Sequence, residues 1–201
     1  MDEVIKDARI NRKTIHITFF DLEDALGSVP HNLIEQTLKR NYFPPEVIDF
    51  VQNLYANSEA KVVTSSWESE PFPFRRGVFQ GDPYSPIIFI QCFNPIIEDL
   101  INKSEYGYNL NGEDIISLPY ADDFCLITTN KLRHQKMINE INANMLSMGL
   151  KLKPSKCRSF SLRSGKPTVV DFNIGENSIP SIAHEEQKFL GKVVFFSGKH
   201  S

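Results

Sequence analysis

Apolar and polar positions alternate along this chain in a way that predicts short strands separated by amphipathic helices. Residues 14–20 are mostly β-branched and aromatic, a pattern typical of a buried strand. The apolar runs 115–118 and 124–128 predict the two arms of a β-hairpin, with Asp122-Asp123 at its tip. Asn111-Gly112, just upstream, is itself a hairpin signal. Further strands are expected near residues 157–162, 168–174 and 188–196.

Helices are expected where apolar residues recur every three or four positions. These segments are residues 2–13, a segment that starts near Ser28 and Pro30, a segment that starts at Pro44-Pro45, and residues 85–101 and 131–148. Apolar positions are so frequent in 85–101 that this helix should be largely buried. Gly149 is the expected stop of the last helix, whose inward side chains would be Leu132, Met137, Ile138, Ile141, Met145 and Leu146.

Residues 60–65 and 70–76 are the predicted arms of another hairpin. Trp67 in its turn is expected to pack locally, although an indole near a loop can also stack on a nucleic-acid base. His16, inside the first predicted strand, is expected to be a packed histidine rather than a metal ligand.

The composition is that of an ordinary globular domain, with 201 residues, 41% of them hydrophobic, and a net charge of -3. Basic side chains collect after residue 150, which fits a solvated face or a phosphate-binding track equally well. No apolar run is long enough to cross a bilayer, and the N-terminus lacks the apolar centre of a signal peptide. Cys92, Cys125 and Cys157 fit no disulfide or metal pattern. We therefore expect buried free thiols in a reducing intracellular compartment, the cytoplasm or the nucleus.

Three carboxylates are the main candidates for chemistry. Asp122 and Asp123 would repel each other at a tight turn, which favours a magnesium or manganese site, while ordinary turn chemistry is the alternative for the pair by itself. Asp21 ends the first strand, where its carboxylate can face a cleft. Two Gly and two Pro in residues 75–86 predict an irregular loop whose backbone can approach a ligand. The helix that follows this loop would favour an anion at its N-terminus.

Taken together, these motifs resemble the reverse transcriptases, most closely those of non-LTR (LINE-type) retrotransposons. Residues 20–31 resemble their first catalytic motif, and residues 76–86 (RGVFQGDPYSP) resemble their template and nucleotide loop. The tetrapeptide at 120–123 (YADD) is similar to their catalytic motif. Gly149-Leu150 with Lys156-Cys157 resembles the fourth motif, and residues 189–191 (FLG) the primer-grip region. Each match is weak by itself, but five in the right order across residues 19–191 are specific.

The resemblance implies an α+β polymerase palm with a ferredoxin-like β-α-β-β-α-β core. It would be a single domain over residues 1–201, with a helical insertion at 31–70. The implied activity is that of an RNA-directed DNA polymerase, which transfers nucleotides from deoxynucleotide triphosphates on an RNA or DNA template-primer. Two Mg²⁺ or Mn²⁺ ions, held by Asp21, Asp122 and Asp123, would clamp the attacking 3′ oxygen and the leaving pyrophosphate.

The resemblance also assigns substrate contacts. Gln80 and Gly81 would contact the incoming nucleotide or its template partner, and Leu22 and Tyr120 would lie at the same substrate site. Leu26 would crowd the 2′ carbon of the sugar, at a position where the family usually has an aromatic residue. Lys156 would donate a proton to the leaving pyrophosphate, or would simply face solvent on its loop.

Two departures from the family pattern favour a second function class. The segment before Thr14 is shorter than the family's fingers, and the chain stops soon after the primer-grip region. We therefore expect fingers and thumb to be missing segments of a larger polyprotein, and the apolar surface that they would cover favours self-association. The alternative function is a truncated or repurposed palm that binds nucleic acid or protein without turnover. A nucleotide cyclase and a viral RNA-dependent RNA polymerase fit the Gly-containing loop and Tyr120-Ala121 poorly.

Overall fold

The structure, a computed structural model, describes residues 1–182, 186–189 and 192–195. The chain forms two compact units: unit 1 holds residues 1–23, 95–147 and the chain from 151 onward, and unit 2 holds residues 24–94 and 148–150. The elements are α1 (Asp2–Ile10), β1 (Ile15–Phe20), α2 (His31–Arg40), α3 (Pro45–Ala56), β2 (Glu59–Ala60), β3 (Phe72–Pro73), α4 (Ser85–Ile101), the 3-10 turn η1 (Ser104–Tyr106), β4 (Tyr108–Leu110), β5 (Glu113–Ile115), β6 (Phe124–Thr128), α5 (Lys131–Ser147), β7 (Arg158–Arg163), β8 (Lys166–Pro167), β9 (Phe172–Ile174), β10 (Asn177–Ile179), β11 (Glu186–Phe189) and β12 (Lys192–Phe195).

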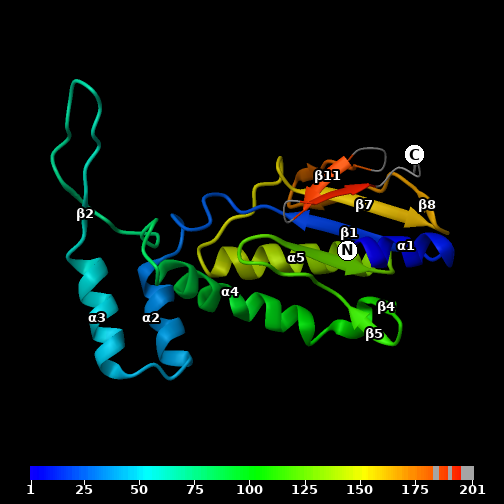
Figure 1. The fold of residues 1–201 in the computed structure, drawn as a ribbon, viewed down its shortest axis with the longest axis horizontal. Helices are drawn as coiled ribbons and strands as arrows, with labels where there is room; N and C mark the ends of the chain where they lie inside the picture. Colours follow the sequence, from blue (N-terminus) through cyan, green and yellow to red (C-terminus); the bar gives the residue numbers. More distant parts are fainter. Residues whose placement is uncertain (183–185, 190–191, 196–201) are drawn as a thin grey trace. The chain divides into compact units, whose positions relative to one another are not determined.

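A four-stranded sheet with the order β6-β1-β7-β8 forms the centre of unit 1, and its neighbouring strands are all antiparallel (Figure 1). Every residue of β1 and β6 is buried, because both faces of these strands are covered. Alternate side chains of β1 point to one face. There, Ile15, Ile17 and Phe19 join the apolar side chains of α1 in one core.

Polar side chains pair β1 with α5 on the other face. His134 lies with its Nε2 2.8 Å from Thr18 Oγ1 and its Nδ1 2.9 Å from Thr128 Oγ1. The Nδ1 of His16 lies 2.8 Å from Ser161 Oγ. Since a hydroxyl can donate or accept, these three hydroxyls serve both ring nitrogens of a neutral His134 and one ring nitrogen of His16. Both histidines are buried, which confirms the prediction of a packed His16.

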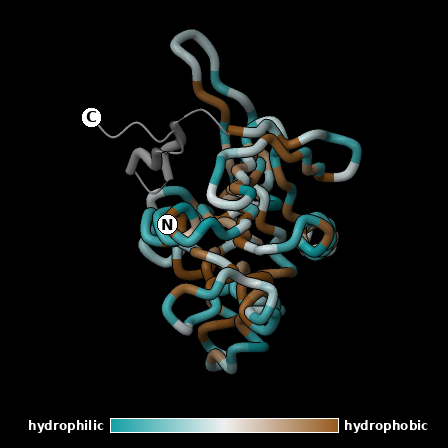
Figure 2. Tube along the Cα trace, turned by 90° about the vertical axis from the view of Figure 1, so that its right-hand side faces the viewer, coloured by the Kyte–Doolittle hydropathy of each residue, from teal (hydrophilic) through white to brown (hydrophobic). Residues whose placement is uncertain are grey.

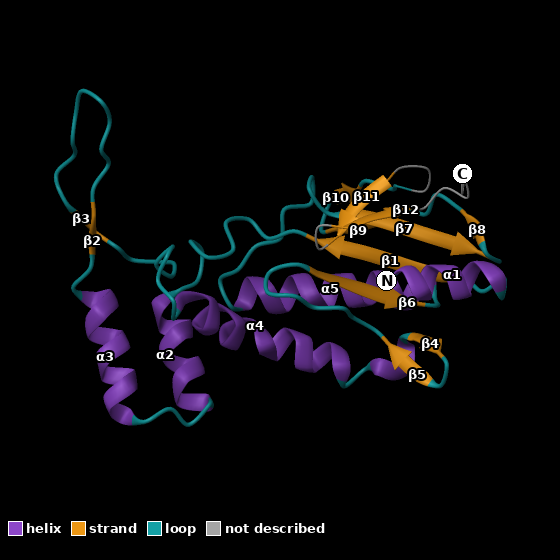
Figure 3. Cartoon of the chain, viewed as in Figure 1, coloured by secondary structure: helices purple, strands orange, loops and turns teal. Residues whose placement is uncertain are grey.

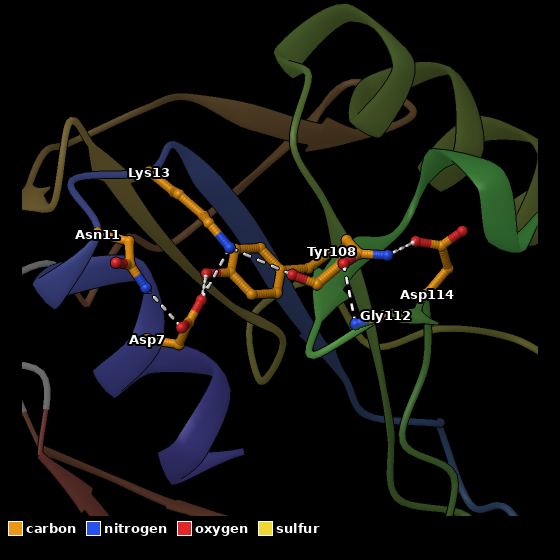
Figure 4. Close-up of polar contacts among 7 residues, drawn as sticks. Asp7, Asn11, Lys13, Tyr108, Gly112 and Asp114 are labelled. Atoms are coloured by element: carbon orange, nitrogen blue, oxygen red, sulfur yellow. Dashed lines mark hydrogen bonds and ion pairs between the residues drawn. The ribbon is translucent and has the colours of Figure 1, made fainter.

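A polar network ties α1 to the β4–β5 hairpin (Figure 4). The Asp7 carboxylate accepts hydrogen bonds from Asn11 Nδ2 at 2.6 Å, from Lys13 Nζ at 2.9 Å and from the Tyr108 hydroxyl. The Tyr108 hydrogen bond, followed by that of Lys13, lowers the pKa of Asp7. Lys13 also donates to the Asn109 carbonyl at 3.3 Å. The network therefore joins the first helix to residues about a hundred positions away.

Two packed helices and a long ribbon make up most of unit 2. Helices α2 and α3 lie side by side, and the ribbon follows α3, with β2 and β3 pairing only at its base (Figure 3). Trp67 at the ribbon's turn is 60% exposed, so the expected local packing is wrong for this side chain. The turn is instead stabilised by Thr64, whose Oγ1 accepts the Trp67 N–H at 3.0 Å.

Most of the predicted elements are confirmed, above all residues 85–101 as α4 and the hairpin turn at Asn111-Gly112, where both residues have positive φ. Residues 115–118 are not the regular strand that we predicted. Only isolated pairs join this arm to β6, such as Ser117 with Leu126, and Pro119 ends the arm before the turn. The mixed helix and sheet architecture is confirmed, whereas the ferredoxin-like connectivity stays a prediction.

Smaller corrections concern helix ends and faces. Helix α1 ends at Ile10 rather than residue 13, because Arg12 has a φ of 50° and turns the chain into β1. Leu132 and Leu146 of α5 were predicted to point inward but are 81% and 52% exposed. The buried stripe is instead completed by His134, a polar residue that periodicity does not select. Leu190 and Gly191 of the predicted primer-grip region lie outside the described residues.

Hydrophobic and hydrophilic segments alternate along the trace, as expected for a fold with a core and a polar surface (Figure 2). In the part of the chain that the structure describes, no helix has the length and apolar character that a membrane span requires. The three cysteines are buried free thiols, as predicted.

The buried histidines predict acid sensitivity. Burial lowers the pKa of His16 from 6.5 to about 4, with Lys131 adding to the effect, and burial also lowers the pKa of His134. A depressed histidine pKa means that the unfolded chain binds the proton more readily. The stabilisation is therefore complete above pH 6.5 and is lost as the pH falls towards 4, by at most about 3 kcal/mol for His16. Thermal melts between pH 7.5 and 4 should show this loss as a fall in melting temperature. The fall should be smaller in His16→Gln. An unchanged pH dependence in His16→Gln would assign the effect to His134 or to carboxylates instead.

Candidate active site

The register between β1 and β6 brings two of the predicted carboxylates to the same end of the sheet. Phe20 pairs with Phe124, and their rings stack with centroids 4.7 Å apart. Asp21 is the next residue after Phe20, and Asp123 is the residue before Phe124. Antiparallel pairing therefore places Asp21 across from Asp123 where both strands end.

A tight turn presents the acidic pair. The Tyr120 N–H donates to the Asp123 carbonyl at 2.7 Å, and the Asp123 N–H donates to the Tyr120 carbonyl at 3.0 Å. Ala121 and Asp122 are thus the two central residues of a hairpin turn, and Ala121 has a φ of 53°. A positive φ at this position is a feature of the primed turns that match the twist of a hairpin. Asp122, Asp123 and Tyr120 are all exposed, Tyr120 by 69%.

The backbone of Asp21 is held from the opposite side by residues 153–157. Its carbonyl accepts the Lys153 N–H at 2.8 Å, and its N–H lies 3.4 Å from Cys157 Sγ. Burial raises the pKa of Cys157 to about 11, so the thiol is protonated and acts as a packing group. Sequence reasoning missed this contact. The available signal was the position of Cys157 as the last residue of the fourth motif, at the start of a predicted strand.

The charges of two aspartates act on the third. Although the Asp123 side chain is exposed, its partial desolvation raises its pKa, and the charges of Asp122 and Asp21 raise it further. The Oδ1 of Asp21 is buried and has no hydrogen-bond partner among the described residues, which is unfavourable for a carboxylate oxygen. Hard oxygen donors of this kind suit Mg²⁺ or Mn²⁺, so the residues fit such an ion. Within the described chain, no group of three or more His, Cys, Asp or Glu side chains already encloses a metal position.

The other candidates of unit 1 lie around this acidic centre in different ways. Leu22 is buried, and its backbone pairs with Leu152. Lys156 lies in the turn before β7, where its N–H donates to the Lys153 carbonyl at 2.9 Å, and its side chain is exposed. None of the hydrogen bonds or ion pairs among the described residues joins the Lys156 ammonium to the three aspartates.

Unit 2 carries Leu26, Gln80 and Gly81. The Val78 N–H donates to the Leu26 carbonyl at 2.8 Å, so the backbone joins Leu26 to the loop that contains the other two residues. Gly77 has a φ of 92°, and a Cβ there would lie 2.9 Å from the Cα of Gly27. Only glycine allows both this conformation and this approach. A backbone hydrogen bond therefore links Leu26 to the loop that carries Gln80 and Gly81, the other two residues predicted to contact the nucleotide.

Asp82 ends this loop, three residues before α4 begins at Ser85. Its carboxylate accepts the Tyr84 N–H at 3.1 Å and the Ser85 hydroxyl at 3.3 Å, as in an Asx turn. Gln80 and Gly81 are exposed, and no atom lies within 4 Å of the place that a Cβ of Gly81 would take. A ligand can thus reach the loop backbone directly.

Comparison with known families gives one match over nearly the whole chain. Residues 1–194 match the family model described as reverse transcriptase (RNA-dependent DNA polymerase). Over 199 residues, the chain is 30% identical to the Retrovirus-related Pol polyprotein from type-2 retrotransposable element R2DM of Drosophila melanogaster, covering 95% of the chain. It is 29% identical to the corresponding type-1 R2 polyprotein of Nasonia vitripennis over 201 residues, covering 96% of the chain. The chain spans only 18% and 19% of the lengths of these two relatives.

Solved structures of similar fold include telomerases. Apo telomerase from Candida tropicalis superimposes with a TM-score of 0.62 at 13% identity, over 85% of this chain and 32% of that one. Telomerase from Candida albicans, in complex with a TWJ fragment of telomeric RNA, gives a TM-score of 0.60 at 13% identity, over 100% of this chain and 35% of that one. At such low identity, the likeness shows the fold only.

The electrostatic coupling can be measured without substrate. Asp122→Asn removes a like charge, so it should lower the pKa of Asp123. Carbon-13 NMR titration of the aspartate carboxyls would measure this pKa. Asp114→Asn, which removes one charge from the exposed strand β5, is the matched control and should leave it unchanged. Equal pKa values of Asp123 in wild type and Asp122→Asn would contradict a shared acidic centre.

Proposed function

We propose that this chain, which belongs to the reverse transcriptase (RNA-dependent DNA polymerase) family, is a catalytic palm that extends a primer on an RNA or DNA template. The observation that carries this proposal is the placement of Asp21 across from Asp123 at the strand ends, with a buried Asp21 oxygen that lacks a partner. Such an oxygen gains most from a cation. The palm would have the β-α-β-β-α-β core and the single-domain organisation over residues 1–201, with residues 31–70 inserted.

Divalent metal ions are general in reverse transcriptases, and we assign two Mg²⁺ or Mn²⁺ ions to Asp21, Asp122 and Asp123. When bound, such ions supply charge stabilisation for phosphoryl transfer. The chain's own contribution is positional. The β1–β6 register sets the separation of Asp21 and Asp123, and the turn at Ala121 exposes Asp122 beside them. The raised pKa of Asp123 means that protons compete with metal binding at a higher pH than for an ordinary carboxylate.

The nucleotide contacts come from unit 2 in this proposal. Gln80 and Gly81 present exposed polar and backbone groups to the base pair, and Leu26 crowds the sugar. Lys156 is exposed and free to approach a pyrophosphate as a proton donor, and Leu22 and Tyr120 would complete the substrate surface. Template-primer and deoxynucleotide triphosphates are the proposed substrates, and we place this activity inside the cell.

Further segments of the polyprotein are the proposed partners, since the chain is a small part of its relatives' length. Val47, Phe50 and Leu54 of α3 are exposed apolar side chains that border a groove of about 330 Å³ within unit 2. Such a surface supports contact with fingers or thumb segments, or self-association. The alternative function, a palm that binds without turnover, shares all of these features and differs only in catalysis.

Primer extension separates the two functions. Extension with deoxynucleotides should require Mg²⁺ or Mn²⁺, and Asp122→Asn should reduce it by about a thousandfold or more, because the metal clamp supplies several kcal/mol of transition-state stabilisation. Calorimetry with Mn²⁺ should show weaker binding by Asp122→Asn, with Asp114→Asn as the control. Undiminished extension by Asp122→Asn would contradict the metal assignment. Intact Mn²⁺ binding without any wild-type extension would favour the binding module.

Sugar selection tests the Leu26 assignment. Leu26→Ala removes the bulk proposed to exclude a 2′ hydroxyl, so incorporation of ribonucleotides relative to deoxynucleotides should rise about tenfold or more. The hydrogen bond from Val78 uses the Leu26 backbone, so the substitution should leave the loop in place. Leu26→Phe is the matched control and should not raise the ratio. A ratio that stays constant in Leu26→Ala would remove Leu26 from the substrate site.

A further inference from the structure

Four aromatic rings from distant parts of unit 2 form one group beside the nucleotide loop, here called the stack. Tyr55, Phe74 and Phe79 are stacked, and His31 is tilted against them. Phe79, the residue before Gln80, lies nearly parallel to both Tyr55 and Phe74, with centroids 5.0 Å from each. His31 closes the stack, 4.6 Å from Tyr55 and 5.7 Å from Phe74. Stacked pairs of this kind contribute beyond the area that they bury. The stack therefore joins α2, α3 and the end of the ribbon to the loop.

The loop is fixed on both sides of its two exposed residues. Phe79 anchors the side before Gln80 through the stack, and Asp82 anchors the side after Gly81 through its hydrogen bonds with Tyr84 and Ser85. The Asp82 N–H also points to the Phe79 carbonyl at 3.4 Å, which closes the short segment on itself. Among the described residues, no hydrogen bond or ion pair involves the Gln80 side chain, and Gly81 has no side chain. Their position thus depends on these two anchors.

Tyr55 and His31 connect the stack to the loop a second time. The Tyr55 ring is 4% exposed, and burial raises its pKa, with Asp82 adding to the increase and Ser85 and the Phe79 backbone opposing it. The Tyr55 hydroxyl is buried near Ser85 and the Phe79 backbone, but among the described residues it has no hydrogen-bond partner. The Nε2 of His31 donates to the Gly77 carbonyl at 3.2 Å, at the beginning of the same loop. Each ring thus contacts the loop by stacking, by a polar group or by both.

We propose that Phe79, Tyr55 and His31 are positioning residues that hold Gln80 and Gly81 in the conformation that binds the incoming nucleotide. That the loop binds a nucleotide rests on the proposed function. That these rings position the loop rests on the loop geometry alone. A stack that only stabilised the fold could lie anywhere in unit 2. This stack instead contacts the loop at Gly77 and Phe79, directly before the two exposed residues, and the Tyr55 hydroxyl lies near Ser85 beyond them.

Primer extension by the full-length protein tests the functional part. Phe79→Leu keeps an apolar side chain but removes the stacking ring, so the KM for deoxynucleotides should rise about tenfold with a smaller change in kcat, since misplacing a binding group by about 1 Å can cost up to about 100-fold. Phe79→Tyr retains the ring and should restore the KM. Phe89→Leu is the matched control, because it removes a ring from another buried stack of unit 2, 5.9 Å from Phe93.

Hydrogen–deuterium exchange tests the positioning without any activity. Phe79→Leu should speed exchange in the segment 78–85, whereas Phe89→Leu should lower the melting temperature without this local effect. Equal exchange of this segment in both variants, with an unchanged KM, would overturn the inference and leave a purely structural stack. If the wild-type protein shows no metal-dependent extension, the proposed function fails. The exchange comparison still decides whether the stack positions the loop.

Discussion

The antiparallel register of β1 and β6 is the constraint on which the acidic site depends. A slip of one residue would turn every side chain of β1 to the opposite face of the sheet. Such a slip would turn Ile17 and Phe19 out of the apolar core towards the polar face of the sheet, and it would separate Thr18 from His134. Because both faces of the two strands are buried, the core enforces the pairing of Phe20 with Phe124. The position of Asp21 opposite Asp123 follows from that pairing, so the apolar core determines the geometry of the polar site.

The nucleotide loop of unit 2 is positioned by a different kind of contact. No long strand pairing reaches Gln80 or Gly81. The loop is instead held by a close approach of two glycines, Gly27 and Gly77, by one backbone hydrogen bond to Leu26, and by the ring of Phe79. Contacts of this kind fix a loop while leaving its tip accessible, which a binding loop needs. They also make its position sensitive to single side chains, unlike the sheet end that carries Asp21.

Local patterns were sufficient to predict most elements and the acidic turn, because periodicity and turn chemistry are properties of neighbouring residues. The helix at 85–101 and the turn at Asn111-Gly112 are examples. The contacts that hold the site were not predictable in this way. His16 meets His134, Cys157 meets Asp21, and Phe79 meets Tyr55 only after distant segments pack together. Residues 115–118 misled the prediction for the same reason, since an apolar run does not reveal whether a partner strand is aligned with it.

The acidic centre also differs from the ion-paired carboxylates of unit 1 in what surrounds it. Asp7 binds Lys13, while Asp99 and Glu140 share Lys103, so these three carboxylates are neutralised by lysine. Among the ion pairs of the described residues, none includes Asp21, Asp122 or Asp123. Three mutually repelling carboxylates without a lysine or arginine partner reduce stability, and a fold selected for stability would replace or pair them. Retaining them unpaired at the end of a rigid sheet is understandable if their partner is a cation that arrives with the substrate.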